Sequence, residues 1–388
     1  MRILALCGNS NLSSLFEIRK KSEFPPVPSL EYAWFHCASL GEYEQAAPVI
    51  ESYVSLNPKT PILITFFSPS GYNHVMENPP SWIRKGDSIC ALPFDTPRRI
   101  RNFLKSVDYR IKFFATCKYE VWPELMKQLQ GASIHTCIFG AHIYKGSALL
   151  RKSIVGAFLR NSWSQFSTIL TQDSSSVEEL AQFKISSEAI GDPRVDRVLQ
   201  LAINTKPSAD LLKWKSSSEL VVAGSTWRPE EISLTTLPWS ESRKLLIAPH
   251  EIKKSHIDEI LSLFNSTSRI ASLLSEGRLD TPVVIADSMG ELTSYYHLAD
   301  LAVVGGGFGK GIHNILEPAA HGIKIITGPK IRRFREAVKL KEEGVLNTVS
   351  ESNLLASVVW SALSAEKPSS TWLDSQKGCV IKIVSTLP

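Results

Sequence analysis

Five glycines and a lysine stand together at residues 305–311, in the run Gly-Gly-Gly-Phe-Gly-Lys-Gly, and the acid Glu317 follows shortly after. The run comes after an apolar segment, 301–304, that has the length and β-branching of a buried strand, and a helix is expected over 313–321. Backbone N–H groups of a glycine-rich turn can approach a phosphate closely at the positive end of such a helix. The stretch is therefore expected to bind a nucleotide, with the phosphate on the loop and the sugar hydroxyls on Glu317.

Two common phosphate loops do not fit this spacing. A Walker A loop requires a Ser or Thr directly after its Gly-Lys pair, whereas Lys310 is followed by Gly311. The dinucleotide fingerprint opens the first βαβ unit of a domain and has an acid about 20 residues later. Here the loop lies far along the chain and its acid falls within the expected helix. A glycine-rich turn that only connects two elements remains the alternative.

A second candidate for chemistry is Glu42, in the run Ser-Leu-Gly-Glu-Tyr-Glu at 39–44. The run follows an expected strand, Gly41 is expected to allow a tight turn, and Glu42 falls in the first turn of the next helix. A carboxylate at that position is stabilised in its ionised form by the helix dipole and can accept a proton. Glu42 is thus a candidate general base, and an ordinary capping acid is the alternative interpretation.

Two further strand-to-helix turns of the first half carry polar side chains. Ser68 and Ser70 could orient a polar acceptor or simply cap a helix. Lys118 and Glu120 follow another expected strand and are suited to the wall of a cleft.

Three turns of the second half have the same design, with small residues and N–H donors where a base or phosphate could bind. Their candidate residues are Gly224, Ser225, Thr226, Pro249, His250, Met289 and Gly290. His250 could contact a phosphate, although a structural hydrogen-bonding role is the alternative for a single histidine.

The elements that must position these turns alternate regularly. In the first half, strands are expected at 32–38, 61–67, 88–92, 111–116, 133–138 and 166–171, and helices at 42–54, 96–106, 121–129 and 174–183. After a polar, Pro-containing stretch at 204–210, strands are expected at 219–223, 244–248, 282–285, 300–304, 323–326 and 345–348, and helices at 251–264, 289–298, 313–321 and 334–342. Such repeats predict parallel sheets covered on both faces, with ligands outside the carboxyl ends of the strands. The fold class is α/β, as two Rossmann-like, doubly wound domains that face a cleft, at 1–203 and 204–388.

Composition is consistent with this organisation. The 388 residues exceed what one hydrophobic core usually supports, and 43% hydrophobic and 21% charged residues describe an ordinary globular protein. The net charge of +5 is compatible with an anionic substrate or a membrane surface. Six cysteines lack metal-ligand spacing and are expected to be reduced core residues of a cytoplasmic protein. No apolar run is long enough to span a bilayer, and the chain has no Asp-x-Asp pair for a metal-bound nucleotide diphosphate.

In their order along the chain, these motifs resemble those of the 3-deoxy-D-manno-octulosonic acid (Kdo) transferases of lipopolysaccharide assembly. The matching segments are 35–42, 119–123, 191–197, 224–226, 287–292 and 305–318, with Gly328-Pro329 and Phe334 beyond them. Each motif is weak alone, and the ordered series is specific.

The resemblance implies a metal-independent, inverting glycosyltransferase of the GT-B type, without a cofactor or a nucleic-acid partner. Residues 1–203 would bind the acceptor, a phosphorylated lipid A precursor (lipid IVA), and 204–388 the donor CMP-Kdo, with the last helix crossing back. Glu42 would be the general base, and Glu120 is the second catalytic candidate. Acceptor binding is assigned to Ser39, Gly41, Ser68, Ser70, Lys118 and Arg98. Binding of the CMP moiety is assigned to Gly224, Ser225, Thr226, Pro249, His250, Met289, Gly290, Gly307, Asn314 and Glu317. Of these, Asn314 would contact the phosphate and Glu317 the ribose.

Three departures from the family pattern stand out. Lys118 and Tyr119 replace an acid and a threonine, and His250 replaces an arginine. The usual apolar N-terminal anchor is missing, so the expected peripheral attachment to the cytoplasmic face of the inner membrane would depend on a surface such as Arg19–Lys21. A GT-B enzyme or epimerase that uses a UDP-sugar, or a non-catalytic two-domain sugar-binding protein, are the alternative functions.

Overall fold

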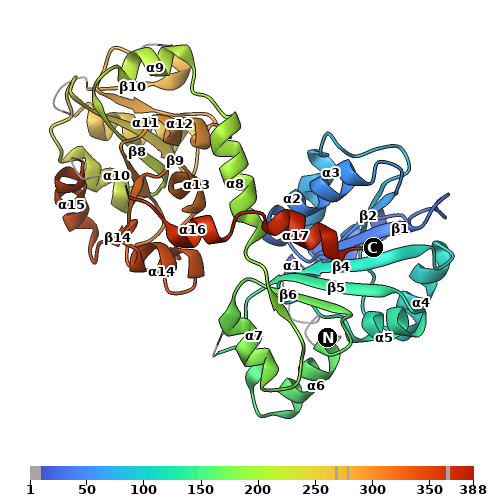
Figure 1. The fold of residues 1–388 in the computed structure, drawn as a ribbon. Helices are drawn as coiled ribbons and strands as arrows, with labels where there is room; N and C mark the ends of the chain where they lie inside the picture. Colours follow the sequence, from blue (N-terminus) through green and yellow to red (C-terminus); the bar gives the residue numbers. More distant parts are fainter. Residues whose placement is uncertain (1–9, 145, 267–269, 278, 364–367) are drawn as a thin grey trace. The chain divides into compact units, whose positions relative to one another are not determined.

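The computed structural model describes residues 10–144, 146–266, 270–277, 279–363 and 368–388 (Figure 1). The chain forms two compact units, one that extends to Asp196 and includes the segment Gln376–Pro388, and one that spans Arg197–Ser375. The division falls inside helix α8 (Pro193–Asn204), before the boundary expected at 203/204. The polar stretch expected at 204–210 is shorter in the structure, because α9 (Ala209–Lys215) begins within it.

The first unit is built on a seven-stranded parallel sheet with the order β3-β2-β1-β4-β5-β6-β7. Its strands are β1 (Tyr32–Cys37), β2 (Ile62–Phe66), β3 (Ser88–Ala91), β4 (Ile111–Cys117), β5 (His135–Ala141), β6 (Thr168–Thr171) and β7 (Glu188–Ala189). The central strands are buried along their length, as expected for a parallel sheet covered on both faces.

Helices cover both faces of this sheet (Figure 1). They are α1 (Ser10–Lys21), α2 (Leu40–Leu56), α3 (Pro69–Glu77), α4 (Pro97–Ser106), α5 (Pro123–Gly131), α6 (Ile154–Trp163), α7 (Ser174–Ala181) and, from the C-terminus, α17 (Cys379–Thr386). A proline begins α3, α4 and α5, where its fixed φ and missing N–H suit the first turn. Helix α17 packs beside α2, and the Tyr53 hydroxyl of α2 donates a hydrogen bond to the Pro388 carbonyl at 3.1 Å. The C-terminal helix is therefore an integral part of the first unit.

The second unit repeats this architecture, with a seven-stranded parallel sheet in the order β10-β11-β9-β8-β12-β13-β14. Its strands are β8 (Glu219–Thr226), β9 (Arg243–Pro249), β10 (Ala271–Leu273), β11 (Val283–Ile285), β12 (Leu301–Val304), β13 (Lys324–Thr327) and β14 (Leu346–Thr348). Its helices include α10 (Arg228–Thr235), α11 (Lys254–Phe264), α12 (Leu292–Leu298), α13 (Leu316–Ala320), α14 (Arg335–Glu342), α15 (Leu355–Ala362) and α16 (Thr371–Ser375). The predicted α/β class and the two doubly wound sheets are confirmed.

Three helices of the second unit begin three residues later than the sequence predicted, at 254 instead of 251, at 292 instead of 289 and at 316 instead of 313. The largest consequence is for α13, because only Leu316–Ala320 are helical. Asn314 Oδ1 accepts from the Leu316 N–H at 3.0 Å, and Gly322 follows the helix in the left-handed region at φ +67°. The expectation that a helix over 313–321 would present its dipole to the glycine-rich loop was wrong, since a helix as short as α13 has only a small dipole.

Two smaller expectations also differ. Gly41 does not form a tight turn, because it lies inside α2 and a Cβ there would meet no atom within 4 Å. The five cysteines of the described residues are buried thiols, and Cys7 lies outside the described residues.

Candidate functional site

The strand order reverses between β1 and β4 in the first sheet and between β8 and β12 in the second. Ligands of doubly wound sheets bind outside the carboxyl ends of the strands at such points. Most of the residues singled out in the sequence follow these strands or their neighbours. Each unit therefore has a candidate site of its own.

Glu42 lies directly beyond the carboxyl end of β1, in the first turn of α2. Its Oε2 accepts from the Ala38 N–H at 2.5 Å, and the side chain is only 8% exposed. Burial and, to a smaller extent, the nearby charge of Glu120 raise the pKa of Glu42 to about 7, although the Ala38 hydrogen bond and the charge of Lys118 oppose the shift. A carboxyl group with a pKa near neutrality is suited to accepting a proton from a hydroxyl group.

Lys118 and Glu120 are brought close to Glu42 by the pairing of β1 with β4. Lys118 has a left-handed backbone conformation, with φ +64°, and its N–H donates to the Phe139 carbonyl of β5 at 3.0 Å. Burial also raises the pKa of Glu120. The first site thus combines two carboxyl groups and one lysine at the end of adjacent strands.

The other residues predicted to bind the acceptor lie at increasing distance from Glu42 along the sheet. Ser39 immediately precedes α2, and the Ser68 N–H after β2 donates to the Ala38 carbonyl at 2.8 Å. The hydroxyls of Ser68 and Ser70 are 2.8 Å apart. Arg98 is exposed in the first turn of α4, after β3, and β2 lies between β3 and β1. The structure therefore brings the serines, but not Arg98, to the strands next to Glu42.

The expected basic surface at Arg19–Lys21 was only partly correct. Lys20 and Lys21 are exposed, but the Arg19 guanidinium lies 4.5 Å from the Phe67 ring centroid and 4.3 Å from that of Phe94. It also donates to the Phe67 carbonyl at 3.1 Å. Burial and the charge of Arg99 lower the pKa of Arg19 to about 10. Arg19 attaches α1 to the first unit and is not a free surface cation.

In the second unit, the glycine-rich loop packs tightly over the ends of the strands. Gly306 has a φ of +88°, and a Cβ there would lie 2.4 Å from the Gly311 carbonyl oxygen. Gly307 approaches Gly328 so closely that a Cβ would lie 2.5 Å from the Gly328 nitrogen. Lys330 Nζ donates to the Gly309 carbonyl at 2.6 Å and so attaches the loop from the next strand end. Glycine is required here for backbone packing within the loop itself.

Asn314 and Glu317 are joined by a hydrogen bond of 2.8 Å from the amide of Asn314 to the carboxylate. The other carboxylate oxygen of Glu317 accepts from the Thr293 hydroxyl of α12 at 2.7 Å. Gly224 lies against the same helix, since a Cβ there would be 2.2 Å from the Tyr296 hydroxyl. The turn at Met289 and Gly290 leads into α12, and both residues are exposed.

Three aromatic rings form a stack above the ends of β8, β9 and β12. The ring centroids of Trp227 and His250 are 4.7 Å apart, and those of His250 and His313 are 4.2 Å apart. Trp227 Nε1 donates to His313 Nε2 at 3.0 Å. Burial lowers the pKa of His313, and the charge of His250 lowers it further. The stack brings the predicted His250 together with two rings that the sequence analysis did not assign to the site.

Two buried acids were also missed. Glu230 accepts from the Gly306 N–H at 3.0 Å and from the Trp227 N–H at 3.2 Å. Glu231 accepts from the Thr226 hydroxyl at 3.0 Å and lies 3.1 Å from His256 Nε2. Burial raises the pKa of both acids. Their position in the first turn of a helix beside a candidate turn was the only sequence signal.

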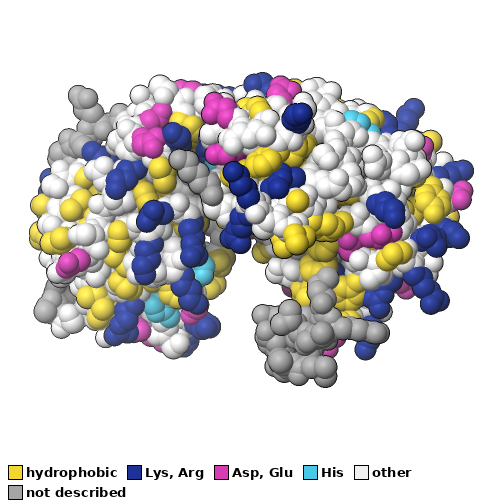
Figure 2. All heavy atoms as spheres, turned by 90° about the horizontal axis from the view of Figure 1, so that it is seen from below, with side chains coloured by type: hydrophobic (Ala, Val, Ile, Leu, Met, Phe, Trp, Pro, Cys, Tyr) yellow, Lys and Arg dark blue, Asp and Glu magenta, His cyan; other side chains and the backbone are white. Residues whose placement is uncertain are grey.

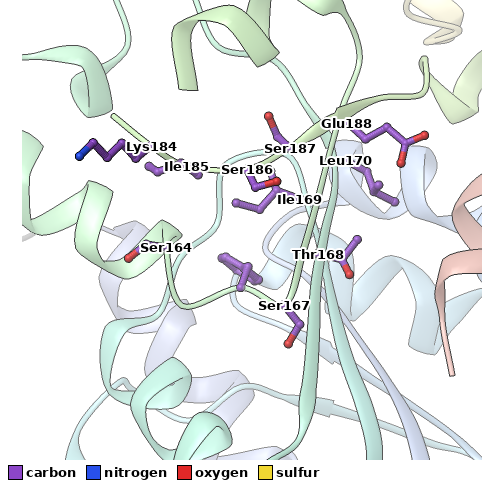
Figure 3. Close-up of a pocket in the computed structure, with 11 residues that line it drawn as sticks. Ser164, Ser167, Thr168, Ile169, Leu170, Lys184, Ile185, Ser186, Ser187 and Glu188 are labelled. Atoms are coloured by element: carbon purple, nitrogen blue, oxygen red, sulfur yellow. The ribbon is translucent and has the colours of Figure 1, made fainter. Parts of the chain in front are cut away.

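A pocket of about 530 Å³ lies elsewhere in the first unit, at the edge formed by β6 and β7 (Figure 3). Its charged lining residues, Lys184 and Glu188, lie on opposite sides and point away from each other. None of the predicted site residues lines it. This pocket has no arrangement of side chains that suggests catalysis.

Two properties concern the described residues as a whole. Among them, no three His, Cys, Asp or Glu side chains come together as metal ligands. Within the same ranges, no helix combines the length and apolar character that crossing a bilayer requires.

The chain is similar to known proteins. A family model described as 3-deoxy-D-manno-octulosonic-acid transferase (kdotransferase) matches residues 13–197. The 3-deoxy-D-manno-octulosonic acid transferase of Haemophilus influenzae is 29% identical, over 88% of this chain and 81% of its own. The enzyme of the same name from Aquifex aeolicus is 25% identical, over 95% of this chain and 97% of its own.

The fold is shared more widely. The structure of UDP-GlcNAc 2-epimerase from Neisseria meningitidis, bound to UDP-GlcNAc, has a TM-score of 0.58 over 92% of this chain and 99% of its own, at 12% identity. This likeness concerns the architecture alone. The family model covers the first unit, and relatives of the same name extend the similarity through the second. The similarity to Kdo transferases therefore extends through both units, and the chain is a glycosyltransferase.

Proposed function

We propose that this enzyme transfers Kdo from CMP-Kdo to a hydroxyl group of a phosphorylated lipid A precursor, lipid IVA, at the cytoplasmic face of the inner membrane. The observation that carries the mechanism is Glu42, a buried carboxyl group whose pKa is raised to about 7 at the strand-order reversal of the first unit. Glu42 removes the proton of the acceptor hydroxyl as its oxygen forms a bond to the anomeric carbon. The bond from that carbon to the CMP phosphate breaks, CMP leaves with the electron pair, and the configuration inverts.

In this proposal the first unit binds the acceptor. Lys118 contributes a positive charge for an acceptor phosphate, and Ser39, Ser68 and Ser70 offer hydroxyl groups. Glu120 acts on Glu42, because its negative charge helps to raise the pKa of the base. Gly41 contributes no side chain, and Arg98, two strands away, contributes at most to long-range attraction.

The second unit binds the donor. The loop at Gly307 and the turns at Gly224–Thr226 and Met289–Gly290 surround the CMP moiety, with Asn314 at its phosphate and Glu317 at its ribose. Both oxygens of Glu317 already accept one hydrogen bond each, and a carboxylate has lone pairs for more. Pro249 and His250 complete this site. Because CMP leaves as a monophosphate, the mechanism uses no divalent metal.

The test is transfer itself. Purified enzyme is incubated with CMP-Kdo, generated in the reaction, and with lipid IVA in detergent, and the product is examined by mass spectrometry. We expect a mass increase that corresponds to one or more Kdo residues. Absence of any such product, under conditions in which an established Kdo transferase reacts, would refute the proposal.

A further inference from the structure

Helix α6 exposes an apolar face to solvent. Ile154 is 89% exposed, Val155 is 62% exposed and Phe158 is 54% exposed. Phe158 is four positions from Ile154 and three from Val155, and residues at these spacings lie on the same side of a helix, so the three side chains form a single surface. The apolar side of a surface helix normally faces the core, and exposed apolar patches mark interaction sites. The outward face of α6 therefore requires a partner.

The helix is held firmly from its other side. Ser153 caps its N-terminus by accepting from the Gly156 N–H at 3.2 Å, and Trp163 at its C-terminal end is buried. Arg160 donates to the Leu149 carbonyl at 2.6 Å, and its guanidinium lies 4.4 Å from the Phe183 ring centroid. These contacts fix which face of α6 points outward.

The chain segment that contains α6 carries only positive charge. Arg151 and Lys152 are exposed directly before the helix, and the sequence has no Asp or Glu between Glu124 and Asp173. Figure 2 views the molecule from the side on which α6 lies in Figure 1, and shows hydrophobic side chains beside Lys and Arg side chains there. An apolar helix face with basic neighbours is typical of helices that lie on anionic bilayers.

A second copy of the chain is a poorer partner for this face. A twofold contact places the same residues of both copies against each other, so Arg151 and Lys152 would meet their own counterparts. Like charges at such a contact oppose association. An anionic lipid surface accepts both the cations and the apolar side chains.

The position of α6 relates this surface to the acceptor site. The helix connects the carboxyl end of β5 to the amino end of β6, so its N-terminus, with Ile154, lies toward the carboxyl edge of the sheet. Glu42 lies at that same edge.

We propose that Ile154, Val155 and Phe158, with Arg151 and Lys152, dock the first unit onto the surface of an anionic lipid bilayer. This inference rests on the proposed function, because a lipid acceptor would be presented at such a surface.

The test is cosedimentation of the purified enzyme with vesicles of phosphatidylglycerol and phosphatidylethanolamine, or of phosphatidylcholine alone. We expect binding to the anionic vesicles, and a loss of about tenfold or more in the double variant Ile154→Ser/Phe158→Ser, because two exposed apolar side chains leave the bilayer. Arg151→Gln/Lys152→Gln should lose most of the preference for anionic lipid, by on the order of tenfold. The matched control is Leu212→Ser/Ile232→Ser, at two exposed positions of the second unit, which should bind as the wild type.

Two outcomes would overturn the docking surface. One is wild-type binding of Ile154→Ser/Phe158→Ser to anionic vesicles, and the other is a wild-type dimer, seen by sedimentation velocity, that this variant abolishes. Failure of the proposed function is distinguishable, because transfer to lipid IVA in detergent micelles does not need the bilayer. We expect Ile154→Ser/Phe158→Ser to retain transfer in detergent and to lose it with lipid IVA in vesicles.

Discussion

Acids at the two strand-order reversals are held in different ways. Glu42 in the first unit accepts from the Ala38 N–H, four residues away in its own turn. Glu230 in the second unit accepts from Trp227 and from Gly306, which is 76 residues away, and so connects α10 to the glycine-rich loop. Burial raises the pKa of both acids. Glu42 has only a local hydrogen bond, so its carboxyl group can take part in proton transfer. Glu230 joins two distant segments, so its carboxylate maintains the shape of the glycine-rich loop.

The largest effect is expected for Glu42→Gln. Glutamine keeps the size of the side chain and an oxygen for the Ala38 N–H, but it cannot accept the proton. Transfer should fall by roughly 10²–10⁴-fold, while CMP affinity, measured by calorimetry, stays unchanged. Transfer close to the wild-type rate would show that Glu42 is not the base.

For Glu230→Ala, in contrast to Glu42→Gln, we expect the main effect on CMP affinity. The N–H groups of Trp227 and Gly306 would lose their acceptor, at a cost of about 1–3 kcal/mol for the buried Gly306 N–H, and the loop at Gly306 would lose its connection to α10. CMP affinity should fall by on the order of tenfold or more, and the free energy of unfolding of the second unit should decrease. Denaturant unfolding and calorimetry measure both. If CMP affinity is retained, Glu230 does not support a donor site.

The pH dependence sharpens the comparison further. Below a pH of about 7 the Glu42 carboxyl group is protonated, so kcat/KM should rise about tenfold per pH unit up to that point and then level off. The folded state holds this proton more tightly than the unfolded chain, so the contribution of Glu42 to the free energy of unfolding falls between pH 4.5 and about 7. Glu42→Gln should therefore be more stable than the wild type at pH 8, by on the order of 1–3 kcal/mol. Equal stability at pH 8 would contradict the raised pKa.

The smallest expected effect is a difference in KM for the acceptor between variants of two basic residues of the first unit, Lys118 and Arg98. Lys118→Gln should raise KM for the acceptor by about tenfold, since a charge-assisted contact to a phosphate is lost beside Glu42. Arg98→Gln, exposed and two strands away, should change KM by less than about threefold, because exposed charges at a distance are screened by salt. Steady-state kinetics at physiological ionic strength measure both, and a larger effect for Arg98 would move the acceptor site toward β3.

Much of the fold could be predicted from the sequence because the signals are local. Apolar runs bounded by turn residues located the main strands of both sheets to within a few residues, and the prolines that begin α4 and α5 lie within two residues of the expected helix starts. Helix starts in the second unit were less accurate, since polar residues compatible with a helix form the loops over the strand ends instead. Short edge strands such as β7 and β10 have too few residues to produce a pattern.

The candidate sites were predicted less completely. Glu42 and the glycine-rich loop were found because their residue types are unusual in a strand-to-helix turn. Trp227 and His313 were missed, because only the packing of three strand ends brings their rings together with His250. The inward position of Arg19 depends on aromatic rings more than 40 residues away in the sequence, so the residues next to Arg19 do not predict it.

The sequence by itself determined where strands and turns occur and which turns carry reactive side chains, since these depend on neighbours within a few positions. Only the tertiary structure decided which turns converge, because strand order sets which carboxyl ends are adjacent. It also decided that Glu42 is buried enough for a raised pKa and that α6 turns its apolar face outward. Each of these properties arises from contacts between segments that are distant in the chain.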